Sequence, residues 1–220
     1  MENILSAKNI SKSFDGTKVL KEIDLTIKES EIISISGPSG AGKTTLLNIL
    51  GTIETPDVKN DSKLMISNTD ILGLNDKELS KFRNKNIGFV FQFHELLPEF
   101  TCYENVCLPA WIDDDNNIKD RAISLFKDLG LVEKLDKKPA TLSGGERQRV
   151  SIARALINNP KIILADEPSG NLDSKNSEKL YDIFFDLRKK IKTTFIIVTH
   201  NQSLAKKADR QIIIKDGKII

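Results

Sequence analysis

The segment Gly37–Thr44 constrains the fold more than any other part of the chain, because it has the spacing Gly-x-x-x-x-Gly-Lys-Thr. An apolar β-type run, Ile32–Ile35, leads into it, and a helical run, Thr44–Leu50, leads out of it. This order of strand, glycine-rich loop and helix is the context in which such a loop binds phosphate. Backbone N–H groups of the loop close around phosphate oxygens, and the helix points its positive dipole end at the same place.

Two side chains of this segment suit a nucleotide that carries a magnesium ion. Lys43 adds a mobile cation for the phosphates, and Thr44 can offer its hydroxyl to Mg²⁺. The alternative, a glycine-rich turn that binds nothing, is disfavoured because the strand, the helix and the Lys-Thr pair are all in place. The residues expected to hold the nucleotide here are Gly37, Pro38, Ser39, Gly40, Ala41, Gly42, Lys43, Thr44 and Thr45.

Length and composition narrow the class of protein. A chain of 220 residues can bury one good core and a small second lobe. Lys and Arg number 33 against 31 Asp and Glu, and this near balance argues against a nucleic-acid partner bound through bulk charge. No apolar run of about 18 residues is present and the N-terminus lacks a signal-peptide pattern, so we expect a cytosolic protein. The only cysteines, Cys102 and Cys107, lack the spacing of a zinc or redox motif and are expected to be reduced thiols.

Hydrophobic periodicity predicts an α/β protein. Residues 4–29 are predicted to form short strands, and within them Ile23, Leu25 and Ile27 alternate with polar residues as in a half-buried antiparallel strand. Further strands are expected at 64–66, 87–91, 162–165 and 195–198, helices at 76–85, 117–130, 143–158 and 174–190, and a closing hairpin at 211–220.

The chain is expected to be a single domain, residues 1–220, with a helical insertion. The strand pattern stops near Gln92 and resumes near Lys161, with mostly helix between. We assign residues 1–92 and 160–220 to the nucleotide-binding core and residues 93–159 to the helical part. The all-apolar strand run 162–165 is typical of a parallel sheet covered on both faces. We therefore predict a mostly parallel core sheet, an N-terminal antiparallel β subdomain and a helical insertion.

Polar residues suited to phosphate chemistry follow four of the apolar strands. They are the loop carrying Lys43, then Gln92, the pair Asp166 and Glu167, and His200. Open parallel sheets bind ligands at the carboxyl ends of their strands, so these residues are predicted to share one site.

The charges of these residues suggest their roles. Asp166 is placed to act as an anionic ligand of Mg²⁺ beside Thr44, directly or through water. Glu167 is placed to accept a proton from, or to orient, the water that attacks the γ-phosphate. Gln92 can orient the same water or reach Mg²⁺, and His200 can hydrogen-bond the γ-phosphate.

Two features near these motifs leave alternatives open. Phe14, beside Asp15-Gly16, is either a ring that stacks on a nucleotide base or a core phenylalanine. The segment 93–100 mixes apolar residues with proline and charge without a strand or helix period, so it is core, loop or an exposed docking surface. His94 shows no partner in the sequence, and we expect no catalytic role for it.

A second helix N-terminus is suited to an anion. Ser143 is a natural N-cap, and Glu146 completes a capping box three residues later. The pair Gly144-Gly145 would allow close approach of a ligand. An ordinary capped helix is the alternative. Because this place has no lysine or metal ligand of its own, it resembles half of a site that needs the rest from elsewhere.

These motifs together resemble the ATP-binding subunit of ABC transporters along the whole chain. Residues 37–44 resemble Walker A, and 162–167 resemble Walker B with the catalytic glutamate. Gln92 is similar to the Q-loop, His200 to the H-loop, 142–146 to the ABC signature and 170–173 to the D-loop. The resemblance implies a P-loop NTPase fold of the ABC ATPase type that binds ATP and Mg²⁺.

The same resemblance adds features that spacing alone does not. It implies a head-to-tail homodimer on ATP binding, in which Ser143, Gly144 and Gly145 of one subunit contact the γ-phosphate held by the other. It also favours Phe14 as the aromatic ring that stacks on adenine.

A finer resemblance is to the lipoprotein-releasing branch of this family, carried by residues 92–101, 104–106 and 165–173. It implies an ATPase on the cytoplasmic face of the inner membrane, with LolC/LolE-like permease subunits docked near His94–Phe100. MacB-like efflux and FtsE-like division complexes share the form Gly-Asn-Leu-Asp and are the alternative. Two departures are that residues 57–61 lack the usual Ser-Gly turn, and that Phe14 stands where tyrosine is frequent.

Overall fold

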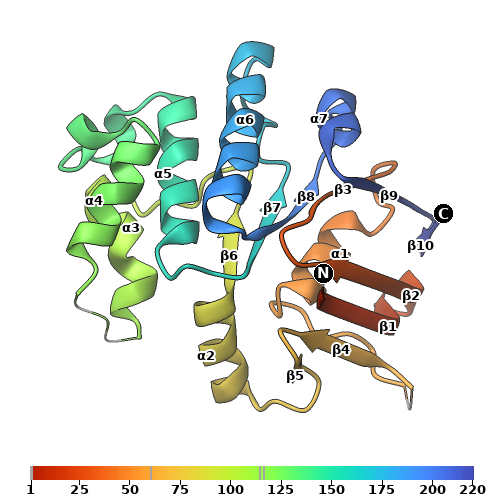
Figure 1. The fold of residues 1–220 in the computed structure, drawn as a ribbon. Helices are drawn as coiled ribbons and strands as arrows, with labels where there is room; N and C mark the ends of the chain where they lie inside the picture. Colours follow the sequence, from red (N-terminus) through yellow and green to blue (C-terminus); the bar gives the residue numbers. More distant parts are fainter. Residues whose placement is uncertain (1, 60, 114, 116) are drawn as a thin grey trace.

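The computed structural model describes residues 2–59, 61–113, 115 and 117–220, and its centre is a six-stranded sheet (Figure 1). The strand order is β10-β9-β3-β8-β7-β6, formed by β3 (Ile32–Ser36), β6 (Ile87–Val90), β7 (Ile162–Asp166), β8 (Thr194–Val198), β9 (Arg210–Lys215) and β10 (Lys218–Ile219). All neighbours pair in parallel except β10, which is antiparallel to β9. The predicted mostly parallel core sheet and the closing hairpin are confirmed.

A four-stranded antiparallel sheet, in the order β2-β1-β4-β5, forms the N-terminal part. It consists of β1 (Asn3–Phe14), β2 (Thr17–Lys28), β4 (Lys63–Ile66) and β5 (Thr69–Asp70). The prediction of short strands in 4–29 was wrong, because β1 and β2 run twelve residues each. Several register shifts interrupt their pairing, and Asn9 and Glu22 have positive φ. These irregularities break the period-two pattern, so one long pair looked like several short strands.

Three helices lie between β6 and β7, grouped on one side of the central sheet in Figure 1. They are α3 (Cys102–Trp111), α4 (Lys119–Asp128) and α5 (Gly144–Leu156), with 3-10 turns at Val132–Lys134 and Pro139–Thr141. Helix α3 was not predicted, because Pro109 stands inside it. A capping box between Thr101 and Glu104 marks its start and was the available signal.

The other helices cover the central sheet or its edges. They are α1 (Lys43–Leu50), α2 (Asp76–Asn86), α6 (Ser174–Ile191) and α7 (Gln202–Lys207). Helix α7 was not predicted, although Asn201 caps it. Residue 60, within the segment 57–61 whose sequence lacks Ser-Gly, lies outside the described residues.

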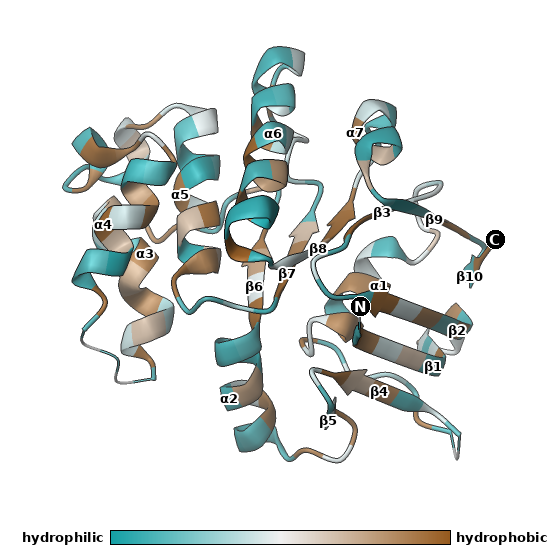
Figure 2. Ribbon diagram, in the orientation of Figure 1, coloured by the Kyte–Doolittle hydropathy of each residue, from teal (hydrophilic) through white to brown (hydrophobic). Residues whose placement is uncertain are grey.

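Two apolar clusters occupy the two faces of the central sheet. One joins the sheet to α3, α4, α5 and α6, and the other joins it to α1 and the β1–β2–β4 sheet. Figure 2 shows hydrophobic residues along β8 and largely hydrophilic ones on the outer part of α6. Cys102 and Cys107 are buried, free thiols within the first cluster. Among the described residues, none of the helices has the length and apolar character to cross a bilayer.

Gly88 in β6 shows how closely the insertion packs on the sheet. A Cβ built at Gly88 would lie 2.2 Å from the backbone oxygen of Ala155 in α5. We expect Gly88→Ala to force β6 and α5 apart and to cost about 1–3 kcal/mol in free energy of unfolding, measured by denaturant titration. Gly73→Ala is the matched control, because a Cβ there would meet only the Asp70 oxygen at 3.9 Å. Equal stability of the two variants would contradict this packing.

Candidate functional site

The loop between β3 and α1 has the backbone geometry of an anion cradle. Gly40 and Gly42 have φ of 75° and 98°, in the left-handed region that favours glycine. A Cβ at Gly37 would lie 2.0 Å from the Ile214 oxygen, so only glycine fits between the loop and β9. Gly42 is the N-cap of α1 and offers no side-chain hydrogen bond, and the first turn holds no acidic residue. The helix therefore begins with N–H groups that an anion can bind.

Lys43 extends its ammonium group back over this loop. Its Nζ donates to the carbonyl oxygens of Gly37 at 3.0 Å and Pro38 at 2.9 Å. The lysine is 6% exposed, whereas Pro38, Ser39 and Gly40 at the loop tip are exposed. A buried cation directed at an exposed glycine-rich tip fits the phosphate group of a nucleotide.

Thr44 and Asp166 meet across the carboxyl edge of the sheet. The Thr44 hydroxyl lies 3.4 Å from Asp166 Oδ1. Burial raises the pKa of Asp166, and the hydroxyl of Thr44 and the charge of Lys43 oppose that rise. Hydroxyl and carboxylate oxygens are the ligands Mg²⁺ prefers. In the described part of the chain no three His, Cys, Asp or Glu side chains cluster as a complete metal site, so such an ion needs further oxygens from phosphate.

Glu167 and His200 are brought into direct contact. His200 Nε2 lies 2.8 Å from Glu167 Oε1, although the two residues follow different strands. Glu167 has φ of 46°, unusual for a residue with a side chain, and its N–H donates to the Val198 oxygen at 3.0 Å. The Glu167 carboxylate therefore follows Asp166 directly in the chain, and the His200 imidazole fixes the direction of that carboxylate.

Gln92 joins this group through the turn that follows Glu167. The Gln92 carbonyl accepts a hydrogen bond from Asn171 Nδ2 at 3.0 Å. A Cβ at Gly170 would lie 2.7 Å from Gln92 Nε2, so glycine there makes room for the amide. The Gly170 N–H in turn donates to the Glu167 oxygen at 2.9 Å. The contacts therefore join Thr44 to Asp166 and Glu167 to His200, and they connect the Gln92 backbone to the turn after Glu167.

The remaining nucleotide-loop residues differ in exposure. Thr45 is half-buried in α1. Phe14 ends β1 with 43% of its surface exposed, and Lys12 Nζ lies 5.0 Å from the ring centroid. The core interpretation of Phe14 was wrong, because the bend at Asp15-Gly16 leaves the ring at the surface.

Helix α5 begins with the predicted capping box. Ser143 Oγ accepts from the Glu146 N–H at 3.3 Å, and Glu146 Oε2 accepts from the Ser143 N–H at 2.8 Å. The bond from the Ser143 backbone, with Lys134 beside it, lowers the pKa of Glu146 to about 2. A Cβ at Gly144 or Gly145 would meet its nearest neighbour only at 3.8 Å. Packing within this chain therefore does not require glycine at either position.

This helix start lines a hollow separate from the phosphate loop. The hollow, of about 350 Å³, is bordered by Ser143–Glu146 and by the turn Asn171–Asp173. None of the described residues of the 37–44 loop lines it. Ser143, Gly144 and Gly145 are thus not brought to the phosphate loop of the same chain.

The segment 93–100 is a loop with a buried and an exposed side. Phe93 and Leu97 are 71% and 43% exposed, whereas Leu96 packs against the core. His94 is buried, and burial lowers its pKa, opposed by hydrogen bonds to the backbone of Phe93 and Gly144. These partners are backbone groups of its own loop and of the start of α5.

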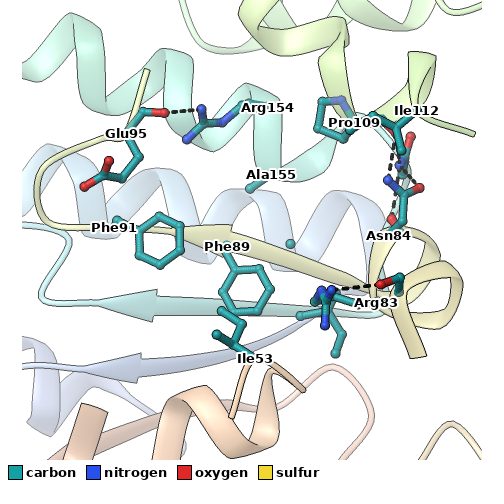
Figure 3. A pocket seen from close by; sticks show the side chains of 14 residues that line it. Ile53, Arg83, Asn84, Phe89, Phe91, Glu95, Pro109, Ile112, Arg154 and Ala155 are labelled. Carbon is teal, nitrogen blue, oxygen red and sulfur yellow. Dashed lines mark hydrogen bonds between the residues drawn. The ribbon is translucent and has the colours of Figure 1, made fainter. Parts of the chain in front are cut away.

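Beside this loop lies a cavity of about 550 Å³, which we call the Phe89 cavity (Figure 3). The rings of Phe89 and Phe91 stack within it, with their centroids 5.7 Å apart. Its lining residues are Ile53, Ser80, Arg83, Asn84, Ile87, Gly88, Phe89, Phe91, Glu95, Pro109, Ile112, Arg154, Ala155 and Asn158. Sequence reasoning missed this cavity and the contacts of Arg154 and Asn171, because each joins residues far apart in the chain.

Comparison with known proteins places the chain in a family. The family model described as ABC transporter matches residues 20–170. The lipoprotein-releasing system ATP-binding protein LolD of Bacteroides fragilis is 53% identical, over 99% of this chain and 100% of its own length. LolD of Cytophaga hutchinsonii is 51% identical over the full length of both chains.

Solved structures agree with these sequence relatives. A dimeric ATP-binding cassette in a post-hydrolysis state, bound to ADP and Pi, aligns with a TM-score of 0.86 and 39% identity. The alignment covers 98% of this chain and 96% of that one. Because the family model matches most of the chain and the LolD relatives match nearly all of it, the chain belongs to the ABC transporter family, among the ATP-binding proteins of the lipoprotein-releasing type.

Proposed function

We propose that this chain is the ATP-hydrolysing subunit of a membrane complex that releases lipoproteins from the bacterial inner membrane. The observation that carries the ATPase part is the contact of Glu167 with His200 beside Asp166 and the phosphate loop. The substrate class is supported by the LolD relatives, about 50% identical over nearly the whole chain. No observation favours the efflux or cell-division alternatives.

The phosphate loop holds the triphosphate, and Lys43 shifts its ammonium from the loop carbonyls to the β- and γ-phosphates. Thr44 and Asp166 would hold Mg²⁺, which would supply positive charge to stabilise the transferring phosphoryl group. Glu167 orients the attacking water and takes its proton as the oxygen–phosphorus bond forms and the β–γ bridge breaks. His200 keeps the Glu167 carboxylate aimed at that water, and Gln92 would orient the same water or reach Mg²⁺.

Two copies of the chain together complete the site. Gly144 and Gly145 leave the start of α5 open to a ligand from outside the chain. In the proposed dimer, Ser143 and these two glycines meet the γ-phosphate bound by the other copy. Because those contacts exist only in the closed pair, they favour closure when ATP is present.

The Phe89 cavity is proposed as the docking place of LolC/LolE-like membrane subunits. It presents apolar Ile53, Phe89 and Ile112 together with the charged Arg83, Glu95 and Arg154. Phe93 and Leu97, in the loop that contributes Glu95 to the cavity, are exposed. Docking there would hold the subunit at the cytoplasmic face of the inner membrane, as the LolD relatives support. The partner's movement would reach Gln92 through the loop that borders the cavity.

Replacing the proposed base tests the ATPase assignment. Glu167→Gln removes the proton acceptor and keeps the hydrogen bond to His200, so we expect ATP binding to persist while turnover falls by about 10²–10⁴-fold. The variant should accumulate as an ATP-bound dimer, measured by size-exclusion chromatography with ATP. Glu178→Gln, on the exposed side of α6, is the control. Normal turnover by Glu167→Gln would remove Glu167 from this role.

Mixed dimers test the shared site. Ser143→Arg blocks the open start of α5, and Lys43→Met removes the phosphate cation, so each homodimer should lose turnover. A mixture pairs one intact phosphate loop with one intact signature across the interface, and we expect it to regain up to about half of the activity per mixed dimer. If mixing restores no activity in a steady-state phosphate-release assay, the head-to-tail arrangement is wrong.

A charge in the cavity tests the docking place. Ile112 is 76% exposed at the cavity rim. Ile112→Asp should reduce co-purification of the membrane subunits at least tenfold, because docking would bury the new carboxylate. Val132→Asp is the control, at a 48% exposed position outside the cavity. Equal recovery of the partner with both variants would place the interface elsewhere.

A further inference from the structure

The residues that follow β6 are held by two side chains from distant elements. Arg154, on α5, donates through Nη2 to the His94 oxygen at 2.7 Å and through Nη1 to the Glu95 oxygen. Asn171, in the turn after Glu167, donates to the Gln92 oxygen at 3.0 Å. The backbone of residues 92–95, which we call the 92–95 loop, is thus fixed by side-chain donors on both sides.

The 92–95 loop has a conformation that needs such support. His94 and Glu95 have φ of 66° and 49°, two successive left-handed residues with no glycine. Residues with side chains keep such angles only where their surroundings fix them. The guanidinium of Arg154 is suited to this task because its planar fork presents several donors at fixed angles, whereas a lysine ammonium is a single point charge.

Arg154 also forms part of the Phe89 cavity. Figure 3 shows its guanidinium beside Glu95, above the rings of Phe89 and Phe91. Burial lowers the pKa of Arg154, and the Glu95 carboxylate opposes this shift. A group that fills the cavity therefore contacts the fork that holds the 92–95 loop, while the same loop begins at Gln92.

We propose that Arg154 is a positioning residue that couples occupation of the Phe89 cavity to the placement of Gln92 at the nucleotide site. It acts through the backbone oxygens of His94 and Glu95 and touches no reacting atom. Asn171 extends the link from Gln92 to the turn that carries Glu167. The inference rests on the proposed ATP site, because the coupling acts on that site through Gln92.

The chain carries its own reporter for this link. Trp111 is the single tryptophan and lies in α3 between the cavity residues Pro109 and Ile112. If the cavity and the nucleotide site are coupled, the coupling is reciprocal, so ATP must alter the surroundings of the cavity. The emission of Trp111 in the isolated full-length chain reports that change without any partner.

The experiment compares the parent chain with Arg154→Met, Arg154→Lys and Arg121→Met. Arg121 is the control, an arginine of the helical part whose Nη2 bonds Asp115. Affinity is measured separately with a fluorescent ATP analogue, and we expect all four proteins to agree within about twofold. MgATP should shift Trp111 emission in the parent and in Arg121→Met. Compared with the parent chain, the Trp111 shift should be at least fivefold smaller in Arg154→Met. In Arg154→Lys it should be less than half of the parent's shift.

Hydrogen exchange of the amides of residues 93–97 gives a second readout. Exchange of these amides should be faster in Arg154→Met than in the parent chain, and exchange in the 37–44 loop should be unchanged. A general loss of stability would instead speed exchange in both segments. A full Trp111 shift in a folded Arg154→Met, or no shift in a parent chain that binds ATP, overturns the inference. If Arg154→Met does not fold, a full shift in Arg154→Lys overturns it and a reduced one supports it. Failure of the parent to bind ATP counts against the proposed function instead.

Discussion

The parallel pairing of β8 with β3 on one side and β7 on the other is the constraint on which the site depends. Val198 pairs with Ile35 in β3 and with Asp166 in β7, so the three strands end in one row. The pairing is secured by burial, because every residue of β8 is covered on both faces. The phosphate loop, Glu167 and His200 follow directly from that row. The register of the sheet therefore sets how close these residues lie, because each of them follows a strand at the same edge.

The same arrangement keeps the start of α5 apart from the phosphate loop within one chain. The start of α5 carries an internally satisfied capping box, yet its two glycines meet no neighbour that requires them. Glycine has the lowest helix propensity after proline, so helix formation alone does not explain two glycines at the start of α5. An approach from outside the chain accounts for them. In the proposed dimer, a hydrolysis site divided between two copies would let closure of the pair control turnover.

Much of this architecture could be predicted from the sequence, since buried parallel strands and capped helices have strong local patterns. Asp166, Glu167 and His200 were found because each follows such a strand. Bulges concealed the length of β1 and β2, and Pro109 concealed α3. Arg154 lies in a helix that the sequence assigned correctly, but its contacts are 59 and 60 residues away. Periodicity carries no information on such contacts, nor on the cavity that they border.

Two sets of left-handed residues with side chains differ in what surrounds them. Asn9 and Glu22 lie in the irregular β1–β2 pair, where they serve strand geometry. His94, Glu95 and Glu167 instead follow buried parallel strands, where the chain leaves the sheet edge at the proposed ATP site. Backbone strain persists only where surroundings maintain it, and at these three positions the support comes from α5 and β8. Strain held by a neighbouring element changes whenever that element moves, so these bends are suited to linking ATP hydrolysis to motion of the helical part.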